Sequence, residues 1–485
     1  MPIEESLNRW CKMREYIFLF INGIEHKIAA KDTLKNLSEY LRETLNMKGT
    51  KVVCSEGDCG ACTVLVNRYI DKSEQNFITI NACIAPLYLL DCSHIVTIEG
   101  IQNSGSLHLV QEMIAKHHGT QCGFCTPGIV NSLVAMSDNL IFNNKSIDIK
   151  KIKNYTTGNL CRCTGYKGIL EAGMALDLTQ IEPLYKRYSS LSIQEALSEH
   201  FALDVVLENK ENEFTIVLPK TIKQALSYKA NGYTLISGGT DISVFRNKGF
   251  KKDFKFISLA NIEKMYQIED TEEKLSFSSM VSLTQVEKKC QNDFEEFSNL
   301  LKVFASPQIK NKGTLIGNIA NGSPIGDSIP FLYVSDASLT IQNEKNSRDV
   351  NIADFYLGYK QFDLKNDEII TSVSIPKNNH KFKIYKVSAR KDLDISAVSL
   401  AIAYEIKQNI FTNISIAFGG VAATVYKAKD IENILLNQGV TEKNFLQASS
   451  LVPTLLAPFS DHRGSSEFRI KLCQNLLMKF FKEVL

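Results

Sequence analysis

The chain has 485 residues, of which 44% are hydrophobic and 22% charged, a composition typical of a folded globular protein with several domains. Its 55 Lys and Arg residues nearly balance its 53 Asp and Glu residues, so charge gives no reason to expect a nucleic acid or an anionic membrane as partner. The N-terminal residues contain early acids and no apolar signal region, and no apolar run approaches the roughly 18 residues of a membrane span, which together predict a cytoplasmic protein.

The first stretch of the chain is predicted to be a small mixed α+β unit. Residues 16–26 place an Asn22-Gly23 step after an apolar run, which is typical of a tight β-hairpin. A helical pattern follows over residues 32–46. Two apolar segments, 62–66 and 77–84, predict further strands.

Ten of the twelve cysteines precede residue 164. Since cytoplasmic thiols stay reduced, metal or redox chemistry is a better prediction than disulfides. The first group has the Cys-x4-Cys-x2-Cys spacing of a plant-type 2Fe–2S loop, with a fourth thiol further along the chain. Gly57 and Gly60 supply the conformational freedom that such a loop requires. Structural zinc is the alternative, but it fits this spacing poorly. The four thiols are those of Cys54, Cys59, Cys62 and Cys83.

Residues 104–178 are predicted to be helical, with helices over 107–118, 127–138, 148–156 and 166–177. Two pairs of cysteines lie at helix ends, where helix N-termini favour a negatively charged cluster. A second iron–sulfur cluster is the preferred interpretation. Zinc is an alternative, and a redox dithiol would leave the second pair unexplained. These four thiols are those of Cys122, Cys125, Cys161 and Cys163.

The rest of the chain contains two segments that suit a bound ligand. Residues 235–242 place two glycines after a predicted strand, where backbone N–H groups can approach a diphosphate. Residues 306–327 are rich in small polar side chains, which suits a ligand-lining loop. Ordinary turns are the alternative for both. From 383 onward the pattern is strand-rich and ends in amphipathic helices.

Three segments resemble the xanthine dehydrogenase and aldehyde oxidase family: residues 56–63, 121–128 and 158–166. The resemblance extends through the two ligand-lining segments and on to about residue 485. It stops where the molybdenum domain of that family would begin, as in the split bacterial arrangement with a separate molybdenum chain.

The resemblance implies a multidomain α+β protein with two 2Fe–2S clusters and one FAD. Electrons would pass from a molybdopterin-binding large subunit, in a heterotetramer, through the clusters to FAD and then to NAD. Gln121 and Cys163 match positions that approach the pterin, and no side chain of this chain would be catalytic. The implied parts are a ferredoxin-like β-grasp domain (1–98), a four-helix iron–sulfur bundle (99–182), a linker (183–212), a FAD-binding domain of the vanillyl-alcohol-oxidase type (213–378) and an α+β C-terminal domain (379–485).

The same resemblance assigns FAD-binding positions, which fall into three sets. The diphosphate would lie against Leu235, Ile236, Ser237, Gly238, Gly239, Thr240, Asp241 and Ile242. The ribityl–adenine side would be held by Thr314, Gly317, Asn318 and Asp327. The flavin ring or the adenine would lie near Phe304, Ile370 and Lys386.

Two positions depart from the family pattern. Ile316 stands where glycine is usual, and Leu393 stands where many relatives have a polar or acidic residue beside the flavin. Leu393 leaves open whether NAD or oxygen is the acceptor. Two alternative functions also stay open: the equivalent subunit of a hydroxylase for an aldehyde, another N-heterocycle or carbon monoxide, and a zinc-containing interaction scaffold without redox activity.

Overall fold

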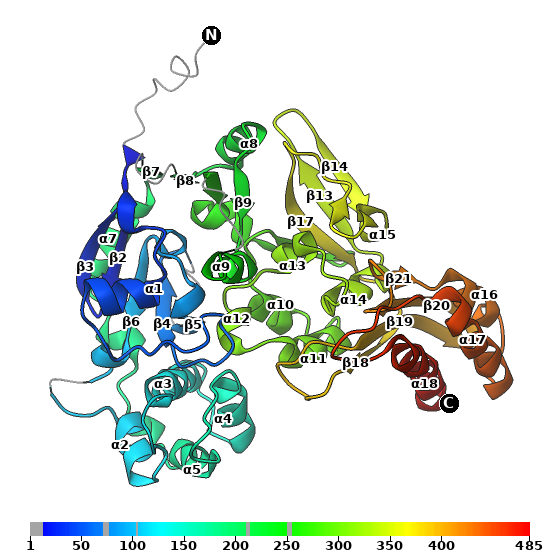
Figure 1. The fold of residues 1–485 in the computed structure, drawn as a ribbon, viewed down its shortest axis with the longest axis horizontal. Coiled ribbons are helices and arrows are strands. Elements are labelled where there is room, and N and C mark those ends of the chain that lie inside the picture. Colours follow the sequence, from blue (N-terminus) through cyan, green and yellow to red (C-terminus); the bar gives the residue numbers. More distant parts are fainter. Residues whose placement is uncertain (1–12, 71–76, 103–104, 210–213, 250–254) are drawn as a thin grey trace. The chain divides into compact units, whose positions relative to one another are not determined.

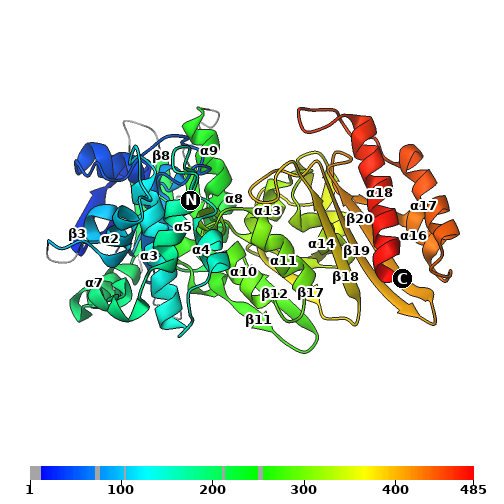
Figure 2. The same ribbon diagram turned by 90° about the horizontal axis from the view of Figure 1, so that it is seen from below.

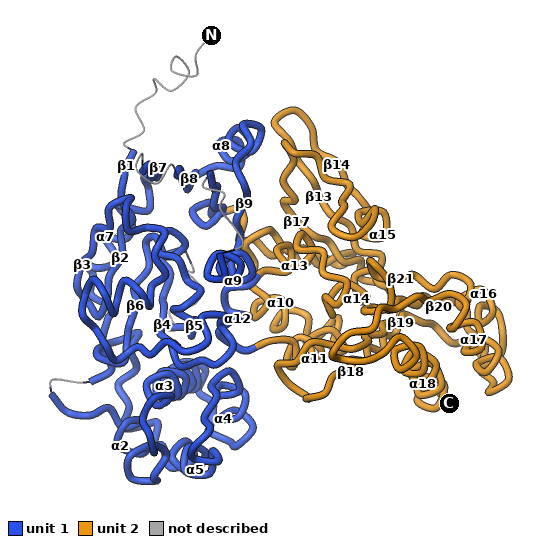
Figure 3. Tube along the Cα trace, in the orientation of Figure 1, with its two compact units in different colours: residues 1–263, 306–313 blue, residues 264–305, 314–485 orange. Residues whose placement is uncertain are grey.

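The computed structural model describes residues 13–70, 77–102, 105–209, 214–249 and 255–485 (Figure 1). The chain divides into two compact units, which Figure 3 shows in different colours. The first unit contains residues 1–263 and 306–313, and the second contains residues 264–305 and 314–485. None of the helices in the described ranges is long and apolar enough to span a bilayer.

The N-terminal domain of the first unit is a five-stranded mixed sheet with strand order β3-β2-β6-β4-β5. The central strand β2 pairs antiparallel with β3 and parallel with β6, as in a β-grasp domain. The predicted hairpin is confirmed, because Asn22 and Gly23 have φ of 50° and 82°, the left-handed pair of a type I′ turn. The strands are β2 (Tyr16–Ile21), β3 (Ile24–Ala29), β4 (Thr63–Arg68), β5 (Ile78–Asn81) and β6 (Ser93–Val96).

The helix predicted over residues 32–46 is wrong in its first half. Only α1 (Leu37–Glu39) and one π-helical turn (Tyr40–Thr44) form there. The chain before α1 runs beside the segment that follows β5, where Leu87 N donates to Lys35 O at 3.0 Å. This long-range backbone pairing replaces the local helical hydrogen bonds.

The predicted four-helix bundle is confirmed. Helix α2 packs on α3 and α5, and α4 packs on the same two helices. Helix α3 is buried along most of its length and forms the centre of the bundle. The helices are α2 (Leu109–Lys116), α3 (Thr126–Phe142), α4 (Ile149–Thr156) and α5 (Lys167–Met174).

The segment 183–212, expected as a linker, has regular structure up to residue 209. It contains α6 (Leu184–Arg187), α7 (Leu191–Phe201) and β7 (Asp204–Asn209). Strand β7 pairs parallel with β1 (Met13–Arg14) and antiparallel with β8. It therefore belongs to the next sheet of the first unit.

That second sheet of the first unit has strand order β1-β7-β8-β10-β9. Strands β8, β10 and β9 are parallel, which matches the strand–helix–strand pattern of the sequence. The elements are β8 (Phe214–Leu218), α8 (Ile222–Ala230), β9 (Thr234–Ile236), α9 (Thr240–Asn247), β10 (Lys255–Ser258) and α12 (Pro307–Lys310).

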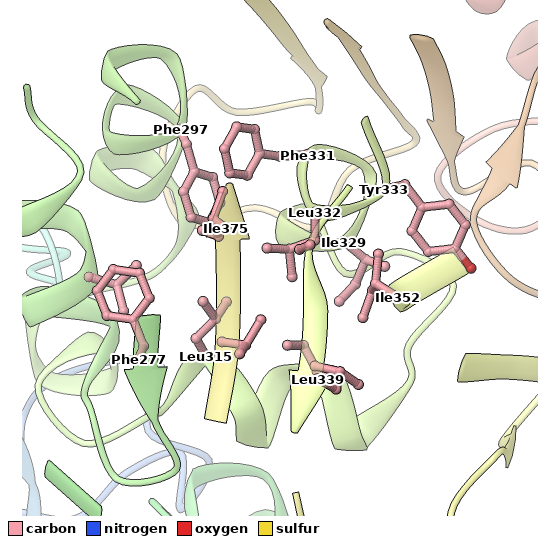
Figure 4. Packing of buried hydrophobic residues seen from close by; sticks show 14 of the residues in the cluster. Phe277, Phe297, Leu315, Ile329, Phe331, Leu332, Tyr333, Leu339, Ile352 and Ile375 are labelled. Atoms are coloured by element: carbon pink, nitrogen blue, oxygen red, sulfur yellow. The ribbon is translucent and has the colours of Figure 1, made fainter. Parts of the chain in front are cut away.

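The second unit begins with an antiparallel sheet of strand order β11-β12-β17-β13-β14. Helices cover it around an aromatic core, in which the rings of Phe297 and Phe331 stack with centroids 4.2 Å apart (Figure 4). The strands of this sheet are β11 (Ile268–Asp270), β12 (Lys274–Ser278), β13 (Ser338–Gln342), β14 (Ser347–Asn351) and β17 (Ile369–Pro376), and a separate two-stranded sheet contains β15 (Tyr356–Gly358) and β16 (Gln361–Phe362). The helices are α10 (Leu283–Lys289), α11 (Glu295–Phe304), α13 (Leu315–Asn321), α14 (Ser328–Val334) and α15 (Ile352–Phe355).

The C-terminal part of the second unit is a sheet of strand order β18-β19-β20-β21. Its three helices pack with this sheet around a shared apolar core (Figure 2). The multidomain α+β class is thus confirmed. The elements are β18 (Lys381–Val387), β19 (Val398–Lys407), β20 (Ile410–Gly419), β21 (Tyr426–Lys427), α16 (Lys429–Leu435), α17 (Glu442–Leu455) and α18 (Ser466–Val484).

Two buried histidines of the first unit predict a loss of stability in acid. His94 Nε2 accepts from Gly23 N and His108 Nδ1 accepts from Val110 N, both at 3.1 Å, which only a neutral ring can do. Burial lowers the pKa of each to about 4, with Arg187 adding to the effect at His108. Because the unfolded-state pKa is about 6.5, the unfolded chain takes up these protons first. Stability is therefore complete above about pH 6.5 and falls by up to about 3 kcal/mol per histidine towards pH 4.

This pH dependence is measured by the urea midpoint of the first unit's unfolding between pH 7.5 and 5. The substitution His94→Gln keeps an acceptor but removes the titration, so it is expected to flatten the dependence. The exposed His462 gives a control, and His462→Gln is expected to leave the slope unchanged. An identical slope in all three proteins would contradict the prediction.

Candidate cofactor-binding sites

The first group of thiols lies on the loop before β4 and on the short helical turn after β5. The Cys54 thiol interacts with those of Cys59 and Cys83, and the Cys62 thiol interacts with that of Cys83. The structure therefore brings together all four thiols that the sequence selects. Asn81 fixes the loop, because its Nδ2 donates to Gly57 O at 2.7 Å.

The second group lies at the N-terminal ends of α3 and α5, as predicted. The Sγ atoms of Cys163 and Cys122 are 3.7 Å apart, and the thiols of Cys125 and Cys161 interact with one another. Cys122 and Cys163 are exposed, whereas Cys161 is buried. One side of this group therefore faces solvent in the isolated chain.

The arrangement of both groups fits a cluster with two irons. In the first group the interactions link all four thiols in succession, from Cys59 through Cys54 and Cys83 to Cys62, and in the second they join Cys122 with Cys163 and Cys125 with Cys161. A 2Fe–2S cluster is held by four Cys thiolates, so each set of four thiols is a donor set that suits it.

The loops that carry the two groups of thiols are hydrogen-bonded to each other, and we call this contact between them the wall. Leu160 N donates to Cys59 O at 2.9 Å, which links the residue before Cys161 directly to a thiol-bearing residue of the first group. Beside it, Asn159 Nδ2 donates to Gly60 O at 3.0 Å. The two ligand loops are thus held against each other by backbone and side-chain hydrogen bonds.

Gly60 is required in this wall, and Gly60→Ala is expected to lower both stability and iron content. Its φ is +69°, and an added Cβ would lie 2.1 Å from Gly158 O. The left-handed backbone alone would cost about 1–2 kcal/mol, and the overlap would push the two ligand loops apart. Iron per chain and the thermal midpoint measure the effect.

Gly232→Ala is the matched control, because Gly232 has φ of +83° and open space around its Cα. The Gly232→Ala variant has the same strained left-handed backbone but no steric clash of the added Cβ. Its thermal midpoint should therefore fall less than that of Gly60→Ala, and its iron content should stay normal. Equal losses in both variants would contradict a special role for the wall.

The diphosphate-binding positions predicted in the first unit lie on the turn from β9 to α9. Leu235 and Ile236 end β9, and the turn leads into α9 at Thr240. Gly239 has φ of +72° at the helix N-cap, and a Cβ on Gly238 would lie 2.0 Å from Lys312 O. The first turn of a helix presents N–H groups without intrahelical acceptors, which suits a diphosphate. The remaining predicted positions on this turn and in α9 are Ser237, Asp241 and Ile242.

The positions predicted in the second unit gather around the start of two helices. Thr314 caps α13, since its Oγ1 accepts from Gly317 N at 3.0 Å. Asn318 Oδ1 accepts from Ser328 Oγ at 2.6 Å, at the start of α14. Asp327 precedes α14 and is joined to β18 by an ion pair with Lys386.

Lys386 and Asp327 form a buried ion pair at this place. Lys386 Nζ donates to Asp327 Oδ2 at 2.6 Å, to Asp394 O at 2.6 Å and to Ser396 Oγ at 2.8 Å. The other carboxylate oxygen, Asp327 Oδ1, is buried and has no hydrogen-bond partner in the described part of the chain. A ribityl or ribose hydroxyl would satisfy it, so these residues fit the polar part of FAD.

The remaining predicted residues are apolar and less diagnostic. Ile370 is buried in β17, and Phe304 ends α11 with its side chain packed on the same core. Leu393 lies in the left-handed region with φ of +55°, a conformation uncommon for a residue with a Cβ. Of the other four thiols, Cys92, Cys290 and Cys473 are buried and Cys11 lies outside the described residues.

Sequence reasoning missed the amide side chains that hold these loops. Asn247 Nδ2 donates to Ser55 O at 2.8 Å and to Cys83 O at 2.9 Å. Asn81, Asn159 and Gln308 have comparable roles. Their partners lie far away in the sequence, so no local signal could have identified them.

Four protein-family models match the chain in succession. They are the 2Fe-2S iron-sulfur cluster binding domain (19–88), the [2Fe-2S] binding domain (97–174), the FAD binding domain in molybdopterin dehydrogenase (212–378) and the CO dehydrogenase flavoprotein C-terminal domain (383–484). The chain therefore carries the domains for two 2Fe–2S clusters and FAD.

Curated relatives match nearly the whole chain. A xanthine dehydrogenase of Oryza sativa is 32% identical over 96% of this chain, one of Emericella nidulans is 29% identical over 97%, and a xanthine dehydrogenase/oxidase of Rattus norvegicus is 30% identical over 97%. The chain spans 39%, 38% and 39% of these relatives, less than half of their length.

Solved structures share part of the fold. A chain of carbon monoxide dehydrogenase from Hydrogenophaga pseudoflava aligns with a TM-score of 0.53 at 20% identity, covering 55% of this chain and 95% of that chain. A chain of quinoline 2-oxidoreductase from Pseudomonas putida 86 gives 0.51 at 20% identity, covering 55% and 94%.

Proposed function

Because this chain belongs to the xanthine dehydrogenase family, we propose that it is the electron-transfer subunit of a xanthine dehydrogenase. It conducts electrons from a molybdenum site on a partner chain to NAD. The eight cysteines of the two groups are the cluster ligands in this proposal. When bound, 2Fe–2S clusters carry single electrons and FAD collects two for hydride transfer.

The observation that carries the proposal is the connection between the two groups of thiols. The hydrogen bond from Leu160 N to Cys59 O joins a ligand loop of one group to a ligand residue of the other through a short run of bonded atoms. The second group has two exposed thiols, those of Cys122 and Cys163, whereas all four thiols of the first group are half-buried or buried. This difference supports electron entry at the second group and onward transfer through the first.

The exposed side of the second group supports a protein partner. Phe124 and Leu160, next to the thiol-bearing residues, are 45% and 43% exposed. Large apolar side chains at a surface favour burial against another protein. In our proposal a molybdopterin-binding large subunit covers them, with Gln121 and Cys163 nearest the pterin, in a heterotetramer.

Cytoplasmic location is part of the proposal. No disulfide joins any of the described cysteines, which agrees with a reducing compartment.

NADH tests the proposed acceptor by running electron flow backwards. Anaerobic NADH added to the purified chain is expected to bleach the flavin absorbance and then the iron–sulfur absorbance. Dithionite serves as the control reductant for both. Bleaching by dithionite but not by NADH would contradict NAD as acceptor and leave the electron-transfer role standing.

A second candidate is the equivalent subunit of a related molybdenum hydroxylase. The fold shared with chains of carbon monoxide dehydrogenase and quinoline 2-oxidoreductase supports it. Substrate choice belongs to the partner chain, so assay of the reassembled complex with xanthine, an aldehyde and quinoline separates these candidates. A zinc scaffold would give a colourless protein.

A further inference from the structure

Gln308 sits at the centre of the wall between the two groups of thiols. It lies in residues 306–313, a short segment that we call the strap and that belongs to the first unit. The residues that flank the strap, Phe304 and Thr314, belong to the second unit and are predicted to bind FAD. Its side chain is only 1% exposed. We propose that Gln308 is a positioning residue that fixes the two cluster-binding loops relative to each other, an inference that rests on the proposed function.

The hydrogen bonds of Gln308 reach both iron–sulfur domains. Its Nε2 lies 3.2 Å from Thr63 Oγ1 in the first domain, 3.2 Å from Asn159 Oδ1 in the helical domain and 3.5 Å from Ser132 Oγ in the same domain. Thr63 follows the ligand residue Cys62, and Asn159 is two residues before Cys161. One amide group thus contacts the immediate neighbourhood of both ligand sets.

The chemistry of the partners fixes the orientation of this amide. The Thr63 hydroxyl donates to Gly60 O at 2.7 Å and the Ser132 hydroxyl donates to Asn159 Oδ1 at 2.7 Å. Both hydroxyl oxygens and the Asn159 carbonyl are therefore acceptors towards Gln308, and only its NH2 group can face them. Its Oε1 points to Gly158, where an added Cβ would lie 2.1 Å away.

The network is closed to water. Thr63, Ser132 and Asn159 are at most 2% exposed. In such surroundings hydrogen bonds are strong and specify one arrangement of the groups that they join. Gln308 is the one member that comes from the strap, so it adds a third attachment to loops already joined by Leu160 and Asn159.

The substitution Gln308→Met tests the proposal, because it keeps the length of the side chain and removes both polar atoms. The remaining members keep their mutual hydrogen bonds, so full iron and FAD content is expected. Electron paramagnetic resonance of the dithionite-reduced protein is expected to show an altered spin–spin interaction between the two clusters. Redox titration is expected to show the midpoint potentials of both clusters shifted. Asn311→Ala is the control on the same strap, where Asn311 donates to Thr79 O of strand β5 at 2.9 Å and has no hydrogen bond to Thr63, Ser132 or Asn159 among those found for the described residues.

The outcomes separate this inference from the proposed function. Signals and potentials identical to the wild type would show that Gln308 only fills space, and a shift of one cluster alone would overturn the shared role. If Gln308→Met does not accumulate, Ser132→Ala removes one member of the network, and wild-type signals in that variant would overturn the proposal. Absence of iron–sulfur signals in the wild type would instead refute the proposed function before any variant is measured.

Discussion

Replacing Cys161 with serine is expected to remove one of two iron–sulfur signals and to halve the iron content, from about four atoms per chain to about two. A thiolate is the ligand that the cluster requires, and a serine hydroxyl stays protonated at neutral pH. Cys161 is paired with Cys125 at the N-terminal end of α3. The elements predicted to bind FAD lie elsewhere, so flavin content is expected to stay normal.

Iron analysis, flavin absorbance and electron paramagnetic resonance together measure this variant. Cys290→Ala is the control, because Cys290 is buried in the second unit and lies outside both groups of thiols. It should retain both signals. Loss of flavin together with the cluster in Cys161→Ser would argue against independent sites.

Replacing Lys386 with methionine is expected to abolish flavin binding and to destabilise the second unit by about 3–5 kcal/mol. The side chains of Lys386 and Asp327 are only 6% and 5% exposed. Removing the lysine would leave a buried carboxylate without its counter-charge, in the place where a FAD hydroxyl is expected to donate. Flavin per chain and the urea midpoint measure the two effects.

Lys383→Met on the same strand provides the control. Lys383 pairs with Glu296 at 2.9 Å, but both side chains are about one-third exposed. Exposed pairs contribute about 0–1 kcal/mol, so this variant should bind FAD normally and lose little stability. Equal destabilisation by both substitutions would contradict a special role for the buried pair.

The sequence predicted the parts of the two iron–sulfur sites that depend on local spacing. Cys83 reaches the loop that carries the other three thiols of its group because β4 and β5 pair side by side, and the thiols of the second group lie just before the starts of α3 and α5. The hairpin at Asn22-Gly23 and the four helices of the bundle are also local features, and they form as expected.

Features that depend on distant partners could not be predicted. The helix over 32–46 is shortened because its first residues pair with the chain after β5, and β7 becomes a strand only because β1 and β8 lie beside it. Gln308 is 245 residues away from Thr63 in sequence, and a glutamine carries no signal of such a contact. The FAD positions came from resemblance and stay a prediction, which the buried Asp327 Oδ1 without a hydrogen-bond partner among the described residues supports at one position.

This one chain is expected to bind two 2Fe–2S clusters, one at each group of four thiols. The most direct test is an electron paramagnetic resonance spin count on the anaerobically purified, dithionite-reduced chain. About two spins per chain in two distinguishable signals are expected, since each reduced 2Fe–2S cluster contributes one. A single spin would contradict a cluster at one group of thiols, and an iron-free protein without spins would contradict the electron-transfer function as a whole.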